Sequence, residues 1–209
     1  MTTAIVLGAT GLVGSELVKV LLSTPFYSSI LLLNRRPSAH SHEKISERII
    51  NFDAPELEGI SGGHLYCALG TTLRKAGSRS RQFKIDCEYP TDIATRLRNQ
   101  GVTSMLLVSS VGANRNANNF YLRTKGQLEK NIMGLNFECT VIARPSFLTG
   151  SRSESRSGEA LATVMLSALS PLMVGALRRY RGIEASEVAA RLVREGQAEA
   201  RGVRIVEFG

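Results

Sequence analysis

The sequence has little of what marks secreted, fibrous or disordered chains. It holds three cysteines and six prolines among 209 residues, and no internal repeat or low-complexity segment interrupts it. With 43% hydrophobic and 21% charged residues the chain can bury a sizeable core, so disorder and fibrous repeats are excluded. Domains most often hold roughly 100 to 200 residues. We therefore expect a single domain over residues 1–209.

The three cysteines, Cys67, Cys87 and Cys139, form an odd set without close spacing, which does not suggest a disulfide framework. Within apolar segments a free cysteine behaves as a small hydrophobe. The first residues lack a basic leader and run directly into a strand-like segment, so a secretory signal is not expected. These absences favour a reducing, cytoplasmic setting.

Acidic residues are fewer than basic ones, and 18 Asp and Glu against 26 Lys and Arg leave a formal net charge of +8. Such a charge favours anionic partners, which include phosphorylated cofactors, nucleic acid and acidic lipid. The basic residues are scattered and carry no recognised nucleic-acid motif, so nucleic acid is not the expected partner. No metal site is expected either.

Long apolar runs are also scarce. The 18 residues from Ala160 to Leu177 are uncharged, but Pro171 splits them. A membrane-spanning helix needs about 20 apolar residues, so a span is not expected. We expect two short helices that line a substrate pocket or a subunit interface, with a segment lying on a membrane surface as the alternative.

Strand-like and helix-like segments alternate over the first 145 residues. Short apolar runs predict strands at 3–7, 30–33, 48–52, 64–69, 102–108 and 137–143, and helical spacing appears at 12–22, 80–100 and 119–133. The helix over 80–100 should break near Pro90. This alternation predicts an α/β fold with a doubly wound, mainly parallel sheet, the Rossmann arrangement. Residues 151–200 should add a small C-terminal helical extension on the substrate side, followed by a last strand at 203–208.

A glycine motif stands where the first strand meets the first helix. Gly8-Ala9-Thr10-Gly11-Leu12-Val13-Gly14 has the spacing and the strand-to-helix context of a dinucleotide-binding turn. In such a turn Gly8 permits the tight exit, Gly11 lets the backbone approach a pyrophosphate, and Gly14 allows close helix packing. The amides of Leu12 and Val13 would face the phosphates, since a helix N-terminus attracts anions. A glycine-rich turn without ligand is the alternative.

Two arginines follow the second expected strand. NAD-selective proteins carry an acidic residue about 20 positions after the glycines, where it binds the adenosine ribose. Here Arg35 lies 21 positions after Gly14, with Arg36 beside it. Two guanidinium groups would bind a 2'-phosphate and leave a plain ribose without its usual acceptor. The sequence therefore predicts NADP(H) as the cofactor, with a solvated surface pair of arginines as the alternative.

A tyrosine and a lysine lie four residues apart in the helical segment after the fifth strand. This spacing puts Tyr121 and Lys125 on one helix face, one turn apart. A nearby cation favours the phenolate, which suits proton transfer at neutral pH. Ser109 and Ser110 end the preceding strand, at the sheet edge where α/β folds bind ligands. One of these hydroxyls could hold a substrate carbonyl.

These residues resemble a known family. The glycine motif, Ser110, and Tyr121 with Lys125 are similar to the cofactor motif and catalytic set of the short-chain dehydrogenase/reductase superfamily, in its atypical branch. More specific segments narrow the resemblance to the Tat-interacting-protein type of oxidoreductase. They cover most of the chain to about residue 160 and comprise 67–72, 75–78, 121–126, 144–145 and 154–156.

The resemblance implies an NADP(H)-binding oxidoreductase in which Tyr121 is the general acid and base. By the same resemblance, Lys125 activates the phenol and holds the nicotinamide ribose, and Ser110 orients the substrate. The implied cofactor contacts are Leu69 and Gly70 near the middle, Arg35 and Arg36 at the 2'-phosphate, and Leu148 and Arg156 towards the nicotinamide.

We therefore expect an NADPH-dependent reductase that transfers a hydride to or from a small-molecule carbonyl or alcohol. A regulatory protein that senses NADP(H) without turnover and a sugar-nucleotide epimerase stay open, because a fold by itself does not give a function. The intact pair of Tyr121 and Lys125 favours the enzyme. Whether the chain forms a homodimer is left open.

Overall fold

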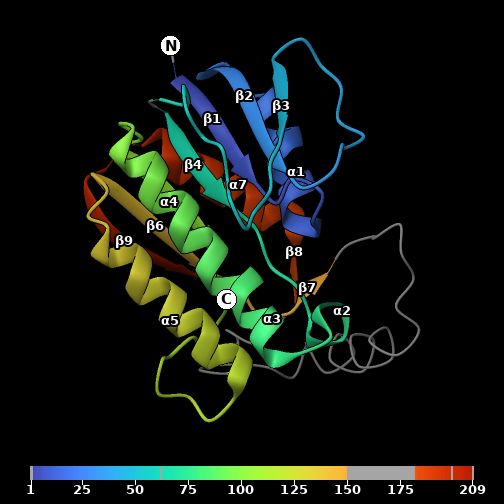
Figure 1. Ribbon diagram of the computed structural model, residues 1–209. Helices are drawn as coiled ribbons and strands as arrows, with labels where there is room; N and C mark the ends of the chain where they lie inside the picture. Colours follow the sequence, from blue (N-terminus) through green and yellow to red (C-terminus); the bar gives the residue numbers. More distant parts are fainter. Residues whose placement is uncertain (1, 62, 150–181, 199, 209) are drawn as a thin grey trace.

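A seven-stranded parallel sheet forms the centre of the molecule (Figure 1). The computed structural model describes residues 2–61, 63–149, 182–198 and 200–208. The strands are β1 (Thr2–Leu7), β2 (Tyr27–Asn34), β3 (Ile45–Ile49), β4 (His64–Cys67), β5 (Ser104–Val108), β6 (Cys139–Arg144) and β9 (Gly202–Glu207). Their order across the sheet is β3-β2-β1-β4-β5-β6-β9, and all paired neighbours run parallel. The predicted doubly wound α/β fold is confirmed.

Helices cover both faces of this sheet. They are α1 (Leu12–Leu22), α2 (Leu73–Ala76), α3 (Arg79–Phe83), the π-helix η1 (Lys84–Glu88), α4 (Tyr89–Asn99), α5 (Phe120–Gly134) and α7 (Ala185–Gln197). Figure 1 shows α4 and α5 side by side on the near face, and α1 and α7 behind the sheet. Two residues each from β7 (Leu148–Thr149) and β8 (Ile183–Glu184) make a separate small parallel pair.

The core is divided into two layers by the sheet. Successive side chains of a strand point to opposite faces. Ala4 and Val6 of β1 therefore pack with the helices α1 and α7, while Ile5 and Leu7 pack with α4 and α5. Both faces of the strands are buried, which explains why they appear in the sequence as continuous apolar runs.

Two sequence expectations change in detail. The strand expected at 48–52 lies at Ile45–Ile49, because these are the residues that pair with β2, and as an edge strand it leaves Ile49 exposed. The chain does not break at Pro90, which fits within the first turn of α4. The irregularity lies one turn earlier in η1, where the Tyr89 N–H bonds to the carbonyl of Lys84 in the wider π pattern.

Among the described residues, the C-terminal part of the chain adds a strand to the sheet and a helix that covers one face of it. The sequence placed residues 151–200 in a substrate-side extension, but α7 packs against α1 and buries Val188 and Leu192 in the core. The strand expected at 203–208 is β9, which extends the sheet beside β6. The helices expected at 159–180 fall outside the described residues.

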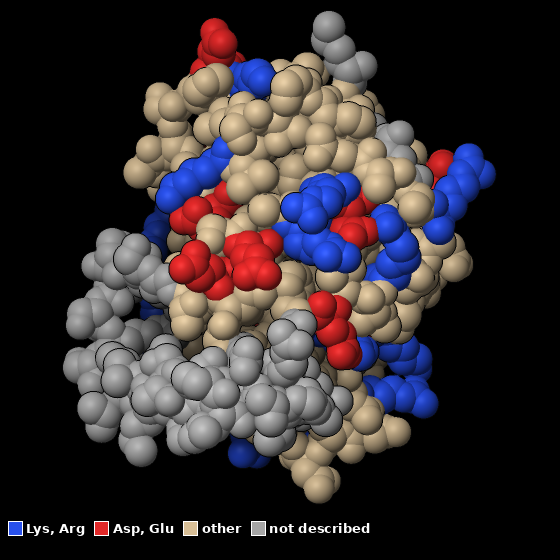
Figure 2. All heavy atoms as spheres, turned by 180° about the vertical axis from the view of Figure 1, so that it is seen from behind, with Lys and Arg blue, Asp and Glu red and all other residues tan. Residues whose placement is uncertain are grey.

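Acidic and basic side chains alternate on the face seen from behind (Figure 2). On α7, Arg191 pairs with Glu195 at 2.8 Å, and Arg204 of β9 reaches the same carboxylate at 2.5 Å. On α1, Lys19 pairs with Glu16 at 2.7 Å. This face is a solvated, mixed-charge surface, so the net positive charge is not concentrated here.

The sheet order places a crevice at one point. From β1 the chain moves outward to β2 and β3, then returns to β4 on the other side of β1. Ligands of open α/β sheets bind where the order reverses, beyond the carboxyl ends of the strands. The residues that follow β1 and β4 therefore face the candidate site.

Candidate active site

The glycine turn after β1 is pressed against the segment that follows β4. Gly8 has φ +90°, and a Cβ there would lie 2.8 Å from the backbone of Ala68 and of Leu69. The first helical turn is equally close, because a Cβ on Gly14 would overlap the carbonyl oxygen of Gly8. Only glycine fits both positions. The turn has the compact form that the sequence motif predicts.

The N-terminus of α1 opens towards the same crevice. Its N-cap is Gly11, which provides no side-chain cap, and no acidic residue stands in the first turn. The first N–H groups of a helix lack intrahelical partners and carry partial positive charge. The amides of Leu12 and Val13, with exposed Thr10 beside them, can therefore hold an anion such as a pyrophosphate. A glycine cradle of this shape fits a dinucleotide.

The place where the sequence predicts the adenosine lies after β2, where Arg35 and Arg36 are both exposed. Sequence reasoning missed an acidic residue here. The carboxylate of Glu47 on β3 accepts hydrogen bonds from the Asn34 side chain at 2.6 Å and from the backbone N–H of Ser38 at 3.0 Å. Glu47 follows Asn34 by 13 residues, and only the parallel register of β2 and β3 brings them together.

Glu47 is held as a carboxylate. Burial would raise its pKa, but the hydrogen bonds from Asn34 and Ser38 outweigh burial and lower the pKa below the ordinary value. The loop between the two strands also turns back towards the glycine turn, where His40 Nε2 lies 3.3 Å from the carbonyl oxygen of Ala9. The two arginines and the hydrogen-bonded carboxylate of Glu47 therefore border the place where an adenosine is expected.

The other end of the crevice holds the expected catalytic set. Tyr121 and Lys125 lie one turn apart on α5, whose N-cap Asn119 accepts a hydrogen bond from the N–H of Leu122. Tyr121 is 38% exposed, whereas Lys125 is 4% exposed and donates to the carbonyl of Val108 at 3.4 Å. The phenol therefore faces solvent above a buried ammonium group.

The two serines after β5 point in different directions. Ser109 is buried, and its hydroxyl donates to Glu129 on α5 at 2.5 Å. Ser110 is half-buried, and its hydroxyl makes a 3.3 Å bond to the carbonyl of Val111. Ser109 is thus committed to the protein interior, and Ser110 remains the hydroxyl that a ligand could reach.

A buried ion pair fixes α5 to the sheet. Arg144 at the end of β6 donates to both oxygens of Glu129, at 3.0 and 2.6 Å, and lies 3.8 Å from Glu207 of β9. The hydrogen bond and charge of Glu129 raise the pKa of Arg144. Glu129 lies one turn beyond Lys125. The ion pair with Arg144 therefore fixes the turn of α5 that carries Tyr121 and Lys125 against β5 and β6.

Further buried groups surround Lys125. Asp86 of η1 accepts the N–H of Thr71 at 2.7 Å, and sequence reasoning did not single it out. The thiols of Cys67 and Cys87 lie close enough to Lys125 to influence it. Burial raises the pKa of each thiol to about 11, so both are protonated at neutral pH and neither is an activated nucleophile.

The remaining expected contacts are distributed along the crevice. Leu69 and Gly70 follow β4 directly, opposite the glycine turn, and Leu148 is half-buried in β7. Arg156 lies outside the described residues. The structure thus brings the glycine turn, Gly70 and Lys125 to one edge of the sheet, while the two arginines stand at its β2 side.

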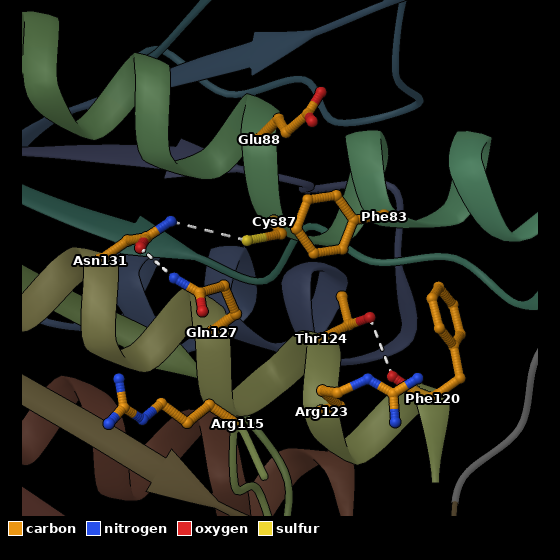
Figure 3. A pocket seen from close by; sticks show the side chains of 9 residues that line it. All are labelled: Phe83, Cys87, Glu88, Arg115, Phe120, Arg123, Thr124, Gln127 and Asn131. Atoms are coloured by element: carbon orange, nitrogen blue, oxygen red, sulfur yellow. Dashed lines mark hydrogen bonds between the residues drawn. The ribbon is translucent and has the colours of Figure 1, made fainter. Parts of the chain in front are cut away.

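A pocket of about 380 Å³ opens on a different face of α5 (Figure 3). None of the expected site residues lines it. Its wall is formed by Phe83, Cys87, Glu88, Arg115, Phe120, Arg123, Thr124, Gln127 and Asn131. In Figure 3 the side chains of Gln127 and Asn131 are joined by a hydrogen bond, and Asn131 also reaches the sulfur of Cys87. The side-chain amides of Gln127 and Asn131 are thus already hydrogen-bonded to neighbouring side chains.

The described part of the chain holds neither a candidate membrane span nor a candidate metal cluster. No helix there has the length and apolar character needed to cross a bilayer. Nor do three or more His, Cys, Asp or Glu side chains gather there as metal ligands. The apolar stretch from Ala160 to Leu177 falls outside these residues.

Comparison with known proteins agrees with the geometry. A family model described as "NAD dependent epimerase/dehydratase family" matches residues 4–131. The chain is 35% identical over 217 residues to "Protein FMP52, mitochondrial" of Coccidioides immitis, covering 97% of this chain and 88% of that protein. It is 40% identical over 157 residues to the protein of the same name from Candida albicans, covering 72% and 69%.

Solved structures share the fold at low sequence identity. A complex titled "MoeE5 in complex with UDP-glucose and NAD" has a TM-score of 0.74 at 15% identity, covering 99% of this chain and 76% of that one. The Bordetella bronchiseptica enzyme WbmF, in complex with NAD+, has a TM-score of 0.71 at 14% identity, covering 100% and 73%.

One expectation is overturned by these comparisons. The cysteine content and the N-terminal residues suggested a cytoplasmic setting, but the related proteins are named mitochondrial. Free, buried thiols fit any reducing compartment, so the cysteines could not distinguish the two.

Proposed function

The chain belongs to the NAD dependent epimerase/dehydratase family, and from this premise we propose that it is an NADP(H)-dependent oxidoreductase of the short-chain dehydrogenase/reductase type. Its substrate would be a small carbonyl compound or the corresponding alcohol. The observation that carries the proposal is the placement of Lys125 and Tyr121 on the same sheet edge as the glycine turn.

The glycine turn and the start of α1 would hold the dinucleotide. Gly8 and Gly14 leave no room for a Cβ, which keeps the turn compact, while Gly11 would let the backbone come close to a pyrophosphate and the helix N-terminus would favour its charge. Leu69 and Gly70 would contact the middle of the cofactor from the β4 side. When bound, the nicotinamide supplies or accepts the hydride.

Arg35 and Arg36 support NADP(H) over NAD(H). Both are exposed at the place where a 2'-phosphate would lie, and guanidinium groups bind phosphate in a bidentate manner. Glu47 favours the competing assignment, because a carboxylate can accept the hydroxyls of a plain ribose. Its oxygens already accept hydrogen bonds from Asn34 and Ser38, which leaves the arginines as the available groups.

The chain's own residues would move the proton. Tyr121 would donate it to the developing alkoxide in reduction, or accept it in oxidation. Lys125 keeps a positive charge beneath the phenol: burial works against that charge, but nearby Tyr121 and Asp86 outweigh burial and raise the pKa of Lys125. Ser110 would orient the substrate oxygen.

Two alternatives rest on the comparisons and on the fold. The family model and the UDP-glucose complex of a structural neighbour favour a sugar-nucleotide epimerase as the second candidate. A protein that binds the dinucleotide without turnover would keep the glycine turn but would not require Tyr121. The names of the relatives support a mitochondrial setting for all three.

Turnover of a panel of aldehydes, ketones and UDP-sugars tests the proposal. We expect NADPH oxidation with at least one carbonyl compound, and a loss of about 100-fold or more in Tyr121→Phe, because a positioned general acid contributes about that much. Lys125→Met should lose activity similarly. Lys130→Met, on the exposed side of the same helix, is the matched control and should retain it.

Binding of NADPH, followed by its fluorescence, shows whether each variant still forms the site. If the parent binds NADPH but converts no compound faster than Tyr121→Phe does, the oxidoreductase proposal fails and the sensor takes its place. If UDP-sugars alone are converted, the epimerase is correct.

A further inference from the structure

The ammonium group of Lys125 is buried with few hydrogen bonds. A lysine ammonium has three N–H donors, and among the described residues Lys125 donates one bond, to Val108 at 3.4 Å. An isolated charge in the protein interior is strongly disfavoured unless an opposite charge compensates it. The structure must therefore supply a counter-charge to this lysine.

Asp86 is the carboxylate in position to do so. It is fully buried, with one oxygen bound to the N–H of Thr71, while the other oxygen, Oδ2, is buried and has no hydrogen-bond partner. A carboxylate with an unsatisfied buried oxygen destabilises a fold. Such a group is retained when its charge serves another purpose.

The π-helix explains how Asp86 comes to point inward. Residues 84–88 take the wider turn of η1, and buried Asp86 and Cys87 follow one another within it. A single π turn changes the direction of side chains within an otherwise regular helix. Pro90 follows in the first turn of α4, which fixes the place of this irregularity.

Gly70 separates the two charges. A Cβ on Gly70 would lie 3.8 Å from Asp86 Oδ1 and 3.8 Å from Lys125 Nζ, so both groups flank this glycine from opposite elements. They do not form an ion pair within 4 Å, but each influences the other: burial raises the pKa of Asp86 and Lys125 partly offsets this, while Asp86 contributes to raising the pKa of Lys125.

We propose that Asp86 is a positioning residue for Lys125, whose carboxylate keeps the buried ammonium charged and directed towards the cofactor edge beside Gly70. The purpose of that charge rests on the proposed function, but the coupling between the two groups does not. The titratable groups that face Lys125 are Tyr121 of its own helix, Asp86 and Cys87 of η1, and Cys67 of β4.

The decisive variant is Asp86→Asn. An asparagine oxygen can still accept the N–H of Thr71, so the loop contact is kept and only the charge is removed. Asp86→Ala removes both. Glu88→Gln removes an exposed charge from the same π-helix and is the matched control.

The measurement is an NMR titration of the Lys125 Nζ signal in lysine-labelled protein, assigned by its absence in Lys125→Arg. In Asp86→Asn we expect the titration midpoint to fall by about one pH unit or more, a tenfold loss of proton affinity, since an opposite charge nearby shifts a group by at least that much. Glu88→Gln should leave it unchanged. An unchanged midpoint in folded Asp86→Asn overturns the proposal.

The unmodified chain provides a second measurement if Asp86→Asn does not fold. The Lys125 signal should move as the carboxyl carbon of Asp86 titrates, and a Lys125 signal indifferent to that titration overturns the proposal. NADPH binding separates the two ideas: a chain that binds no dinucleotide refutes the proposed function while the titration still decides the coupling. Dinucleotide binding with an unmoved midpoint refutes the coupling alone.

Discussion

The two ends of the crevice are built differently. At the β2 end, Arg35, Arg36 and Glu47 are exposed, and the hydrogen bonds of Glu47 join it to Asn34 and to the loop after β2. At the α5 end, Lys125 and Glu129 are buried, and each is held by groups from other elements. An exposed charge can be exchanged without refolding the chain, whereas a buried charge cannot.

The largest effect should come from removing the buried ion pair between Glu129 and Arg144. In Glu129→Gln, Arg144 loses its bidentate partner and Ser109 its charged acceptor, so we expect a loss of about 3 kcal/mol in the free energy of unfolding, measured by urea denaturation. Asp92→Asn, which breaks the exposed pair with Arg96 on α4, is the control and should lose about 0.3 to 0.5 kcal/mol. Equal losses would mean that the buried pair contributes no more to stability than an exposed one.

Changing the exposed end should alter binding and leave stability intact. We expect Arg35→Glu to raise the dissociation constant of NADPH by about tenfold or more, equivalent to about 1.4 kcal/mol, because it removes a phosphate contact and adds a repulsive charge. Its affinity for NADH and its free energy of unfolding should change little. Equal weakening of both cofactors would remove Arg35 from the 2'-phosphate site.

The smallest effect concerns Glu47 and pH. Because the folded state lowers the pKa of Glu47, its stabilisation is present at neutral pH and is lost as the pH falls through the lowered folded pKa. Glu47→Gln should therefore be less stable than the parent by about 0.5 kcal/mol or less at pH 7, and this difference should shrink as the pH falls. A difference that grows towards acid pH would contradict this sign.

The sequence predicted what depends on local pattern. The glycine turn, the doubly wound parallel sheet implied by alternation, and the face shared by Tyr121 and Lys125 all follow from patterns along the chain. The roles of Glu47, Asp86 and Arg144 could not be predicted in this way. These residues join the site through strand register, a π turn and a contact between α5 and β6. Such contacts depend on elements distant in sequence, which no single-chain periodicity records.

The expected cytoplasmic setting is overturned by the mitochondrial names of the relatives, and the reason for the error is chemical. Cysteines that are free and buried fit any reducing compartment, so they do not distinguish one from another.

The tight seat of Gly14 on the Gly8 carbonyl has a kinetic consequence. The contact holds the amides at the start of α1 in one orientation, so under the proposed function capture of a pyrophosphate would need no rearrangement of this turn. Preorganisation of that kind removes an entropic penalty from association and leaves the encounter rate unhindered by slow conformational steps. Differences in affinity among dinucleotides should then appear chiefly in how long each one stays.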